Sequence, residues 1–417
     1  MPAGLGSPAA RFAAVRSATR ALAAPLSPED CAAQSMPDAS PVKWHLAHTS
    51  WFFETFVLDR ERPDYEPFDP AFRILFNSYY NRVGPQHARP ARGLLTRPDL
   101  DTVLAYRRHV DEGMAALLSA GALAPETREV VEIGLQHEQQ HQELLLTDVL
   151  HLFSRNPLRP AYREGGPRPD AKPSPLRWHD HGGGLAELGH AGPGFAFDNE
   201  GPRHRVHLVP FEIASRLVTN GEYRAFMADG GYQRADLWLS DAWARVEAEG
   251  WNAPLYWEEL DGGWRQLGLG GMLDLHPDEP VCHVSFYEAD AYARWSGARL
   301  PTEAEWEVTA AVVPPVGNFV ESDVLAPAGA SEPAEAPSQL FGDCWEWTAS
   351  PYGPYPGYRP PPGALGEYNG KFMANQMVLR GGSCATPASH IRSSYRNFFF
   401  PHARWQWSGI RLARDLR

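Results

Sequence analysis

The chain has few cysteines, no long apolar run and no excess of basic residues. Only four of its 417 residues are cysteine, and no two are spaced as C-x-x-C. That excludes a disulfide-stapled scaffold and suits a reducing compartment, so we expect a cytoplasmic protein. The absence of an 18-residue apolar stretch excludes a transmembrane helix. A formal net charge of -13 argues against a nucleic-acid partner, because phosphate binding requires a basic surface.

The first part of the chain, residues 8–154, predicts helices. Apolar residues near helical spacing between positions 12 and 26 indicate an alanine-rich helix. Further helices are expected at about 41–59, at 99–119 with Asp99 as N-cap, and at 126–154. Four such helices form a bundle, and facing helices of a bundle can build a metal site. A polar, aromatic loop at 76–93 is too long to be a simple connection, which indicates a functional segment.

A change in amino-acid composition divides the chain into two parts. Residues 155–178 contain six prolines and predict a stiff linker. Beyond it, short apolar strands alternate with Gly, Pro and Trp, and two capping boxes, S-x-x-E at Ser285 and T-x-x-E at Thr302, predict short helices. The stretch 312–338 is rich in Ala, Pro and acids and is expected to be a surface loop.

The most informative stretch is "LQHEQQHQEL", residues 135–144. His137 and His141 are four residues apart, which places them about 40° apart on one face of a helix, where they can bind one cation. An ordinary solvated stripe would show the same pattern. A reactive site needs a third ligand, and "KWHLAHTSWFFETF" offers His48 or His45, with His48 on or beside the apolar face. Three imidazoles suit zinc, iron or copper, so spacing does not choose the metal.

The ordered combination of these and other motifs resembles one family. The motifs are "WHLAH", "HEQQHQE", "NSYYNRVGPQH", "PVCHVSFYEADAYARWSGARLPTEAEWE", "CWEWTASPYGPYPGY", "LRGGS" and "SYRNFFFPHARWQWSGIRLAR". From about residue 40 to the end, the chain is similar to the sulfoxide synthases of ergothioneine biosynthesis. The resemblance implies an α plus mixed α/β protein. A DinB-like four-helix bundle at 8–154 is joined by the linker 155–178 to a C-type-lectin-like domain of the formylglycine-generating-enzyme type at 179–417.

The activity that the resemblance implies is that of a non-haem iron(II) enzyme. It would use O2 to join the thiol of cysteine or γ-glutamylcysteine to C2 of the imidazole of hercynine, giving a sulfoxide. The family's W-x-x-x-H pattern selects His48 over His45 as a ligand, and His137 and His141 match the other two. The expected partners are these small molecules, with no membrane and no nucleic acid.

The same resemblance assigns roles around the metal. Gln140 would contact substrate, and Tyr79 or Tyr80 would be the proton donor, with Tyr79 preferred. Arg82 and Arg89 could grip substrate carboxylates as bidentate forks.

The motif near the C-terminus supplies the remaining contacts. A trimethylammonium has no N–H to donate and needs aromatic walls, which Phe398 and Phe399 could provide. Asn397 would hold the hercynine carboxylate, and Arg404 the carboxylate of the thiol. The site would then lie between the two domains.

Three other interpretations remain open. A selenoneine- or ovothiol-type relative would share the iron site and form a related C–S or C–Se bond. A formylglycine-generating enzyme needs a pair of active-site cysteines near the C-terminus, whereas Cys384 stands alone there. A lectin-like binding protein with a structural metal would not need the tyrosine loop. The identity of the thiol and the oligomeric state are not determined by the sequence.

Overall fold

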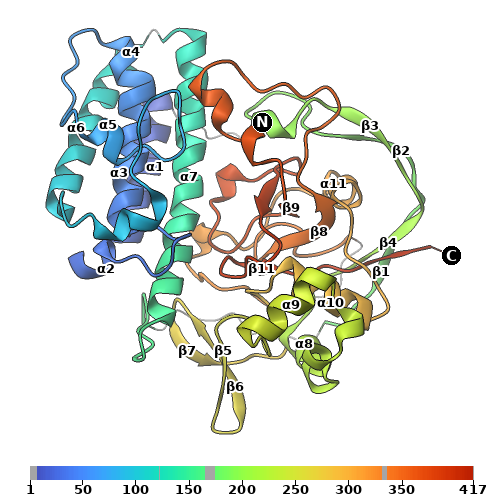
Figure 1. Ribbon diagram of the computed structural model, residues 1–417. Coiled ribbons are helices and arrows are strands. Elements are labelled where there is room, and N and C mark those ends of the chain that lie inside the picture. Colours follow the sequence, from blue (N-terminus) through green and yellow to red (C-terminus); the bar gives the residue numbers. More distant parts are fainter. Residues whose placement is uncertain (1–6, 122, 165–173, 331–335, 417) are drawn as a thin grey trace. The chain divides into compact units, whose positions relative to one another are not determined.

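The computed structural model describes residues 7–121, 123–164, 174–330 and 336–416 (Figure 1). The chain forms two compact units. The first contains residues 1–158 and also a short segment from much later in the chain, Pro362–Tyr368, which the sequence had assigned to the C-terminal domain. The second contains Arg159–Pro361 and Asn369–Arg417. Part of the predicted linker, residues 165–173, lies outside the described residues.

Four long helices form the first unit: α1 (Pro8–Ala23), α3 (Val42–Phe53), α6 (Leu100–Ser119) and α7 (Pro125–Ser154). α3 packs against both α6 and α7, and α1 packs against α7. Asp99 caps α6 by accepting a hydrogen bond from the Thr102 amide at 2.9 Å, as predicted. The expected helix at about 41–59 starts as α3 and continues through a π-helical turn, Glu54–Leu58, to α4 (Asp59–Glu61). Short helices α2 (Pro28–Ala32) and α5 (Phe72–Leu75) lie in the connections.

The polar residues of α7 are buried because they pair across the bundle. Glu138 is fully buried and receives hydrogen bonds from Arg107 on α6 and from Arg16 on α1. Burial raises the pKa of a carboxyl group, but the two guanidiniums outweigh that effect and hold the pKa of Glu138 at about 2. Gln142, one turn further, donates to Thr19 at 3.0 Å. One side of α7 is therefore tied to α1 and α6, which leaves another side for α3.

The second unit contains small sheets and short helices. Its strands are β1 (Trp178–His181), β2 (Gly184–Leu188), β3 (His204–Leu208), β4 (Phe211–Ala214), β5 (Trp257–Leu260), β6 (Gly263–Gly268), β7 (Gly271–Asp274), β8 (Trp345–Pro351), β9 (Met377–Arg380), β10 (Asn397–Phe399), β11 (Ser408–Gly409) and β12 (Ala413–Asp415). They are ordered β1-β4-β12, β10-β9-β8-β11, β2-β3 and β5-β6-β7. Its helices are α8 (Asn220–Ala228), α9 (Ser240–Glu249), α10 (Phe286–Trp295) and α11 (Glu303–Ala310). The predicted capping boxes are present at the starts of α10 and α11.

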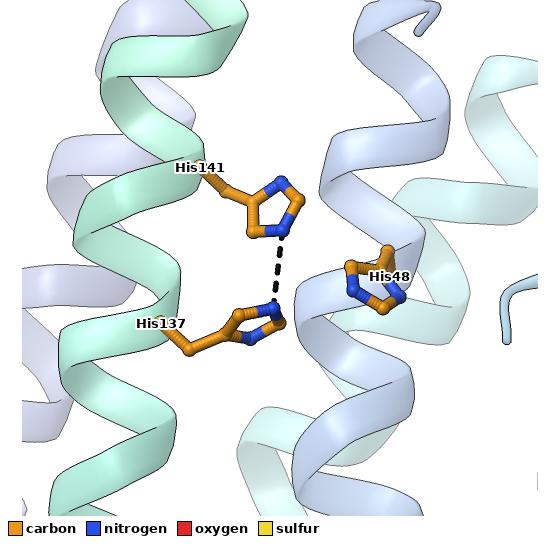
Figure 2. Close-up of side chains that lie close together, drawn as sticks. All are labelled: His48, His137 and His141. Carbon is orange, nitrogen blue, oxygen red and sulfur yellow. Dashed lines mark hydrogen bonds between the residues drawn. The ribbon is translucent and has the colours of Figure 1, made fainter. Parts of the chain in front are cut away.

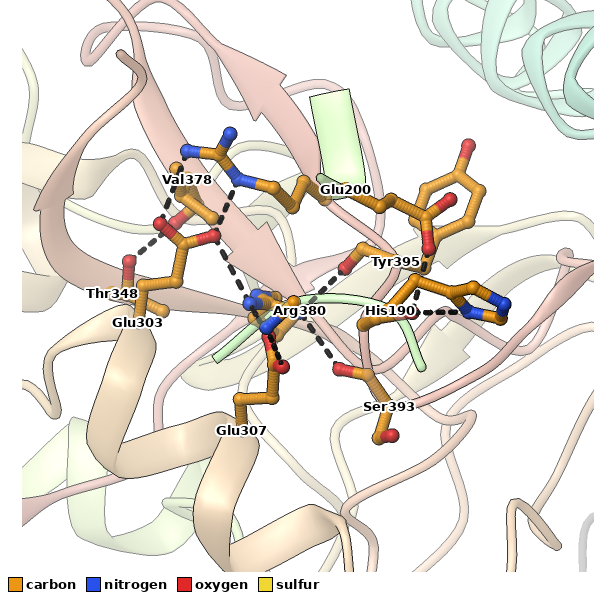
Figure 3. Close-up of polar contacts among 12 residues, drawn as sticks. His190, Glu200, Glu303, Glu307, Thr348, Val378, Arg380, Ser393 and Tyr395 are labelled. Atoms are coloured by element: carbon orange, nitrogen blue, oxygen red, sulfur yellow. Dashed lines mark hydrogen bonds and ion pairs between the residues drawn. The ribbon is translucent and has the colours of Figure 1, made fainter. Parts of the chain in front are cut away.

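Buried ion pairs connect α11 to the β8–β9 sheet (Figure 3). Arg380 at the end of β9 is fully buried and lies 3.0 Å from Glu303. It also pairs with Glu307 and donates to the Ser393 carbonyl oxygen at 2.7 Å. Because each of these charges is both paired and hydrogen-bonded, these interactions offset the desolvation penalty of burying them in this unit. In the described part of the chain, no helix has the length and apolar character needed to cross a membrane.

We predict that replacing Gly134 with alanine destabilises the bundle. A Cβ atom at this position of α7 would lie 2.6 Å from Cε1 of Phe53 and 2.9 Å from Cε1 of Phe52, two fully buried rings of α3. Overpacking of this kind typically costs about 1–3 kcal/mol. Urea unfolding of the metal-free protein, followed by circular dichroism, measures the change.

The matched control for this prediction is Gly113→Ala on α6. There a new Cβ would lie 3.0 Å from the end of the Leu58 side chain and 3.5 Å from Cε2 of Tyr65, which is an ordinary contact distance. The gain in helix propensity, up to about 1 kcal/mol, should offset that contact. Equal stability of the two variants would contradict the close α3–α7 packing at Gly134.

Candidate metal centre

Three imidazoles from two helices converge inside the bundle (Figure 2). His48 comes from α3, and His137 and His141 come from successive turns of α7. Each offers a ring nitrogen, and these nitrogens all lie within 4.8 Å of one another. All three residues are buried, His48 completely. The structure thus brings together the three histidines that the sequence predicts as ligands.

Burial keeps these imidazoles neutral. It lowers the pKa of His137 to about 3. Burial and the neighbouring His137 ring lower the pKa of His48 and of His141 well below the usual value of 6.5. A neutral imidazole has one nitrogen lone pair, which is the form that binds a metal ion. The site is therefore ready to bind a cation at neutral pH without first losing protons.

The hydrogen bonds around the rings direct those lone pairs inward. Nδ1 of His48 donates to the Phe76 carbonyl oxygen at 2.7 Å, so its Nε2, which has no partner among the described residues, carries the lone pair. Nε2 of His137 and Nε2 of His141 face each other at 3.1 Å. Two nitrogens bound to the same ion at about 2.1 Å lie about 3.0–3.4 Å apart, so this spacing fits a shared divalent metal.

No carboxylate belongs to the described cluster. Three neutral ligands leave the full charge of a divalent ion in place, and a three-residue site keeps further coordination positions open. That charge favours an anionic ligand such as a thiolate and lowers the pKa of a bound thiol. The arrangement fits a reactive site better than a structural one, which would be closed by a fourth protein ligand.

An aromatic stack encloses His48. Trp44 stacks with its ring at 4.5 Å and Trp51 stacks with it at 5.4 Å, measured between centroids. The guanidinium of Arg92 lies 3.4 Å from the centroid of Trp44. These rings fix the orientation of His48 and exclude water from that side of the site.

Arg92 is a residue that sequence reasoning missed. It is buried and donates to Ser40 Oγ at 2.9 Å and to Ser78 Oγ at 3.2 Å, with no carboxylate partner in the part of the chain that is described. Burial and the nearby Arg89 lower the pKa of Arg92 to about 9. The predicted Arg82 and Arg89 are instead exposed, and Arg89 donates to the Asp38 carbonyl oxygen. Only burial distinguishes Arg92 from its neighbours, and sequence does not show it.

The two predicted tyrosines stack on each other at 4.7 Å and differ in exposure. Tyr80 is fully buried against Trp51 and Phe56, and burial raises the pKa of its hydroxyl. Tyr79 is half-buried. The assignment of a proton-donor role to Tyr79 or Tyr80 stays a prediction.

A third tyrosine, Tyr368, was not predicted. It lies in the late segment that belongs to the first unit. Its hydroxyl donates to Oε1 of Gln140, and its ring lies 5.7 Å from that of His137 and 6.3 Å from that of Tyr79. The preceding Glu367 accepts hydrogen bonds from the backbone amides of residues 81 and 82. Nothing in the local sequence around Tyr368 signals this position.

The predicted C-terminal contacts lie within the second unit. Asn397, Phe398 and Phe399 form β10, and Phe398 stacks on Tyr352 at 4.0 Å. Arg404 is buried and is engaged by Glu288 at 3.1 Å and by the Ala253 carbonyl oxygen. The assigned substrate roles of these residues stay predictions, and the contacts of Arg404 do not favour a role with substrate.

We predict that alanine at His48, His137 or His141 weakens divalent metal binding by roughly 100-fold or more, because two imidazoles hold such an ion poorly. Anaerobic titration of the metal-free protein with Fe(II) measures the loss. His109→Ala, on α6 and outside the cluster, is the matched control and should bind one equivalent. One equivalent of tightly held metal in His48→Ala would rule out this set and point to another third ligand.

Comparison with known proteins agrees with this architecture. The model of the DinB superfamily matches residues 11–145, and the sulfatase-modifying factor enzyme 1-like domain matches residues 181–332 and 318–416. The expected combination of a DinB-like bundle with a formylglycine-generating-enzyme-type domain is therefore confirmed. The formylglycine-generating enzyme of Streptomyces coelicolor is 37% identical, over 39% of this chain and 56% of its own length.

Two relatives match over nearly the whole chain. The hercynine oxygenase of Mycolicibacterium thermoresistibile is 36% identical over 91% of this chain and 88% of its own length. The hercynine oxygenase of Mycobacterium tuberculosis is 35% identical over 91% of this chain and 92% of its own length. The match spans both domains, and the described residues include a three-histidine cluster that could hold a metal ion. The chain is therefore an oxygenase that belongs to the hercynine oxygenase family.

Proposed function

We propose that this enzyme is an iron(II)-dependent sulfoxide synthase of ergothioneine biosynthesis. It would join the sulfur of cysteine or γ-glutamylcysteine to C2 of the hercynine imidazole. The thiol loses S–H, C2 loses C–H, one oxygen atom of O2 becomes the sulfoxide oxygen and the other leaves as water. The observation that carries the proposal is the buried cluster of three neutral histidines, to which no carboxylate of the described residues belongs. The relatives named hercynine oxygenase support the choice of substrate.

The metal-binding role falls to His48, His137 and His141. Iron bound there would supply the activation of O2 and the attraction for a thiolate. The protein supplies the rest: burial keeps the three rings neutral, and the Phe76 carbonyl and the tryptophan pair fix His48. The buried guanidinium of Arg92, 3.4 Å from the centroid of Trp44, adds positive potential that favours the thiolate over the thiol.

Proton transfer is assigned to one of the phenols beside the cluster. Tyr79 is the proposed acid, because its hydroxyl can give a proton without carrying charge into the site and the residue is not sealed in the core. Gln140 accepts from the Tyr368 hydroxyl and so fixes the direction of that second phenol. Arg82 and Arg89 are proposed for substrate carboxylates. Phe398, Phe399 and Asn397 are proposed for the trimethylammonium and carboxylate of hercynine.

The test of this function is a product assay. Metal-free protein is loaded with Fe(II) without oxygen, mixed with hercynine and with each thiol in turn, and exposed to air. Mass spectrometry should find a sulfoxide-linked conjugate with one of the two thiols, together with O2 consumption. Histidine in place of hercynine should react poorly, since the cation–π contribution of a desolvated cage is about 2 kcal/mol. Absence of the conjugate with both thiols in protein that holds iron would refute the proposal.

We predict that Tyr79→Phe retains metal and loses sulfoxide formation. Only a hydroxyl is removed, and loss of a general acid typically lowers the rate by about 10²- to 10⁴-fold. Oxidation of the thiol alone, to a sulfinic acid, should then increase. Iron content and both products are measured in parallel.

Tyr80→Phe and Tyr368→Phe are the matched controls for this prediction. Each variant removes one phenolic hydroxyl from the tyrosines beside the cluster. Each should form sulfoxide at a rate much nearer that of the unmodified enzyme than Tyr79→Phe does. A collapse in Tyr368→Phe, with near-normal turnover in Tyr79→Phe, would transfer the role of acid to Tyr368.

A further inference from the structure

A fourth buried histidine lies directly behind one of the three ligands. Nδ1 of His45 is 2.8 Å from Nδ1 of His141, and Nε2 of His45 is 3.1 Å from Oδ2 of Asp148. The same carboxylate oxygen accepts a hydrogen bond from the Ser40 amide at 2.8 Å. His45 and Asp148 are both buried, with 2% and 7% of their surfaces exposed. Both ring nitrogens of His45 are thus engaged, and this residue is not a metal ligand.

The partners determine where the protons lie. A carboxylate can only accept, so Nε2 of His45 carries a proton and donates it to Asp148. A neutral His45 then has its lone pair on Nδ1 and accepts from Nδ1–H of His141. His141 consequently has its own lone pair on Nε2, the nitrogen that faces His137 at 3.1 Å. In the opposite arrangement, Nδ1 of His45 would donate to Nδ1 of His141. The proton of a neutral His141 would then lie on Nε2 and block metal binding there.

Helix geometry explains why an intermediate ring is needed. His141 and Asp148 are both on α7, seven residues apart, so they share a face but are separated by about 10.5 Å along the axis. A carboxylate at 148 therefore does not reach the His141 ring directly. His45, inserted from α3, spans the gap and also ties the two helices together beside the cluster.

Among the described residues, neither His48 nor His137 is hydrogen-bonded to a histidine–carboxylate pair of this kind. His48 donates to a backbone carbonyl, and Nδ1 of His137 has no partner among the described residues. Among the described residues, His141 is the ligand that hydrogen bonds connect to a carboxylate, through His45 to Asp148. Partners of this kind hold the tautomer and ring direction of a ligand and raise its basicity, and their loss typically lowers metal affinity about 10- to 100-fold.

We propose that Asp148 and His45 are positioning residues that hold Nε2 of His141 unprotonated and directed at the metal. The proposal rests on the proposed function, because it requires a metal bound by the three histidines. It assigns a role to His45, which the sequence had considered only as an alternative ligand. It also makes Asp148 part of the centre, although this carboxylate is two helical turns from the nearest ligand.

The test uses the full-length protein with its metal removed, and Co(II) as the probe. Visible absorption of bound Co(II) reports both affinity and coordination geometry, independently of turnover. His45→Phe keeps a ring and removes both nitrogens, and Asp148→Leu removes the acceptor. Both should bind Co(II) about 10- to 100-fold more weakly, with altered absorption bands. Asp148→Asn keeps an oxygen that can accept from His45 and Ser40, and should recover most of the affinity.

His151→Gln is the matched control, since His151 is a half-buried histidine of α7 that bonds Ser35 instead of the cluster. It should match wild type in affinity and spectrum. Thermal unfolding of each metal-free variant separates a general loss of stability from a change at the metal.

Two results would overturn the proposal. The first is that wild type binds one Co(II) and His45→Phe binds it equally well. That result would refute the positioning role of His45 and Asp148 but leave the metal centre intact. The second is equal loss in Asp148→Asn and Asp148→Leu, because the amide oxygen retains both hydrogen bonds. If wild type and His48→Ala bind Co(II) equally, the three-histidine centre and with it the proposed function fail.

Discussion

Helix α7 carries charged and amide side chains into a core that excludes water, and each of them must find a partner there. Glu138 meets this requirement through Arg107 and Arg16, which come from two other helices. Removing one partner of such a buried pair typically costs about 3–5 kcal/mol. The pairing fixes the rotation of α7 about its axis. His137, one residue before Glu138, is thereby turned about 100° away, toward α3 and the metal centre.

Desolvation serves both the fold and the chemistry. The same burial that makes unpaired charges costly keeps the imidazoles of the cluster neutral, with the pKa of His137 near 3. Because no carboxylate in the described part of the chain belongs to the cluster, a divalent ion would keep its charge available for substrate. The nearby aromatic rings exclude water from the cluster, and the buried Arg92 keeps the electrostatic potential there positive.

The first unit is completed by residues from far along the chain. Tyr368 is 228 residues from Gln140, whose side chain accepts its hydroxyl hydrogen bond, and its ring borders His137. Glu367 beside it accepts from the backbone of the tyrosine loop. The candidate site is therefore assembled only when the segment Pro362–Tyr368 has joined the bundle. A bundle expressed without the later part of the chain would lack this tyrosine.

The sequence by itself determined what depends on local periodicity and capping: the long helices, the capping boxes of α10 and α11, and the placement of His137 and His141 on one face. His45 and His48 are three residues apart, about 60° around the helix, so both lie near the same face and pattern alone does not separate them. Only the tertiary structure decided that His48 faces the cluster while His45 lies behind it. It also brought in Tyr368 and buried Arg92, because contacts between distant segments leave no local signal in the sequence.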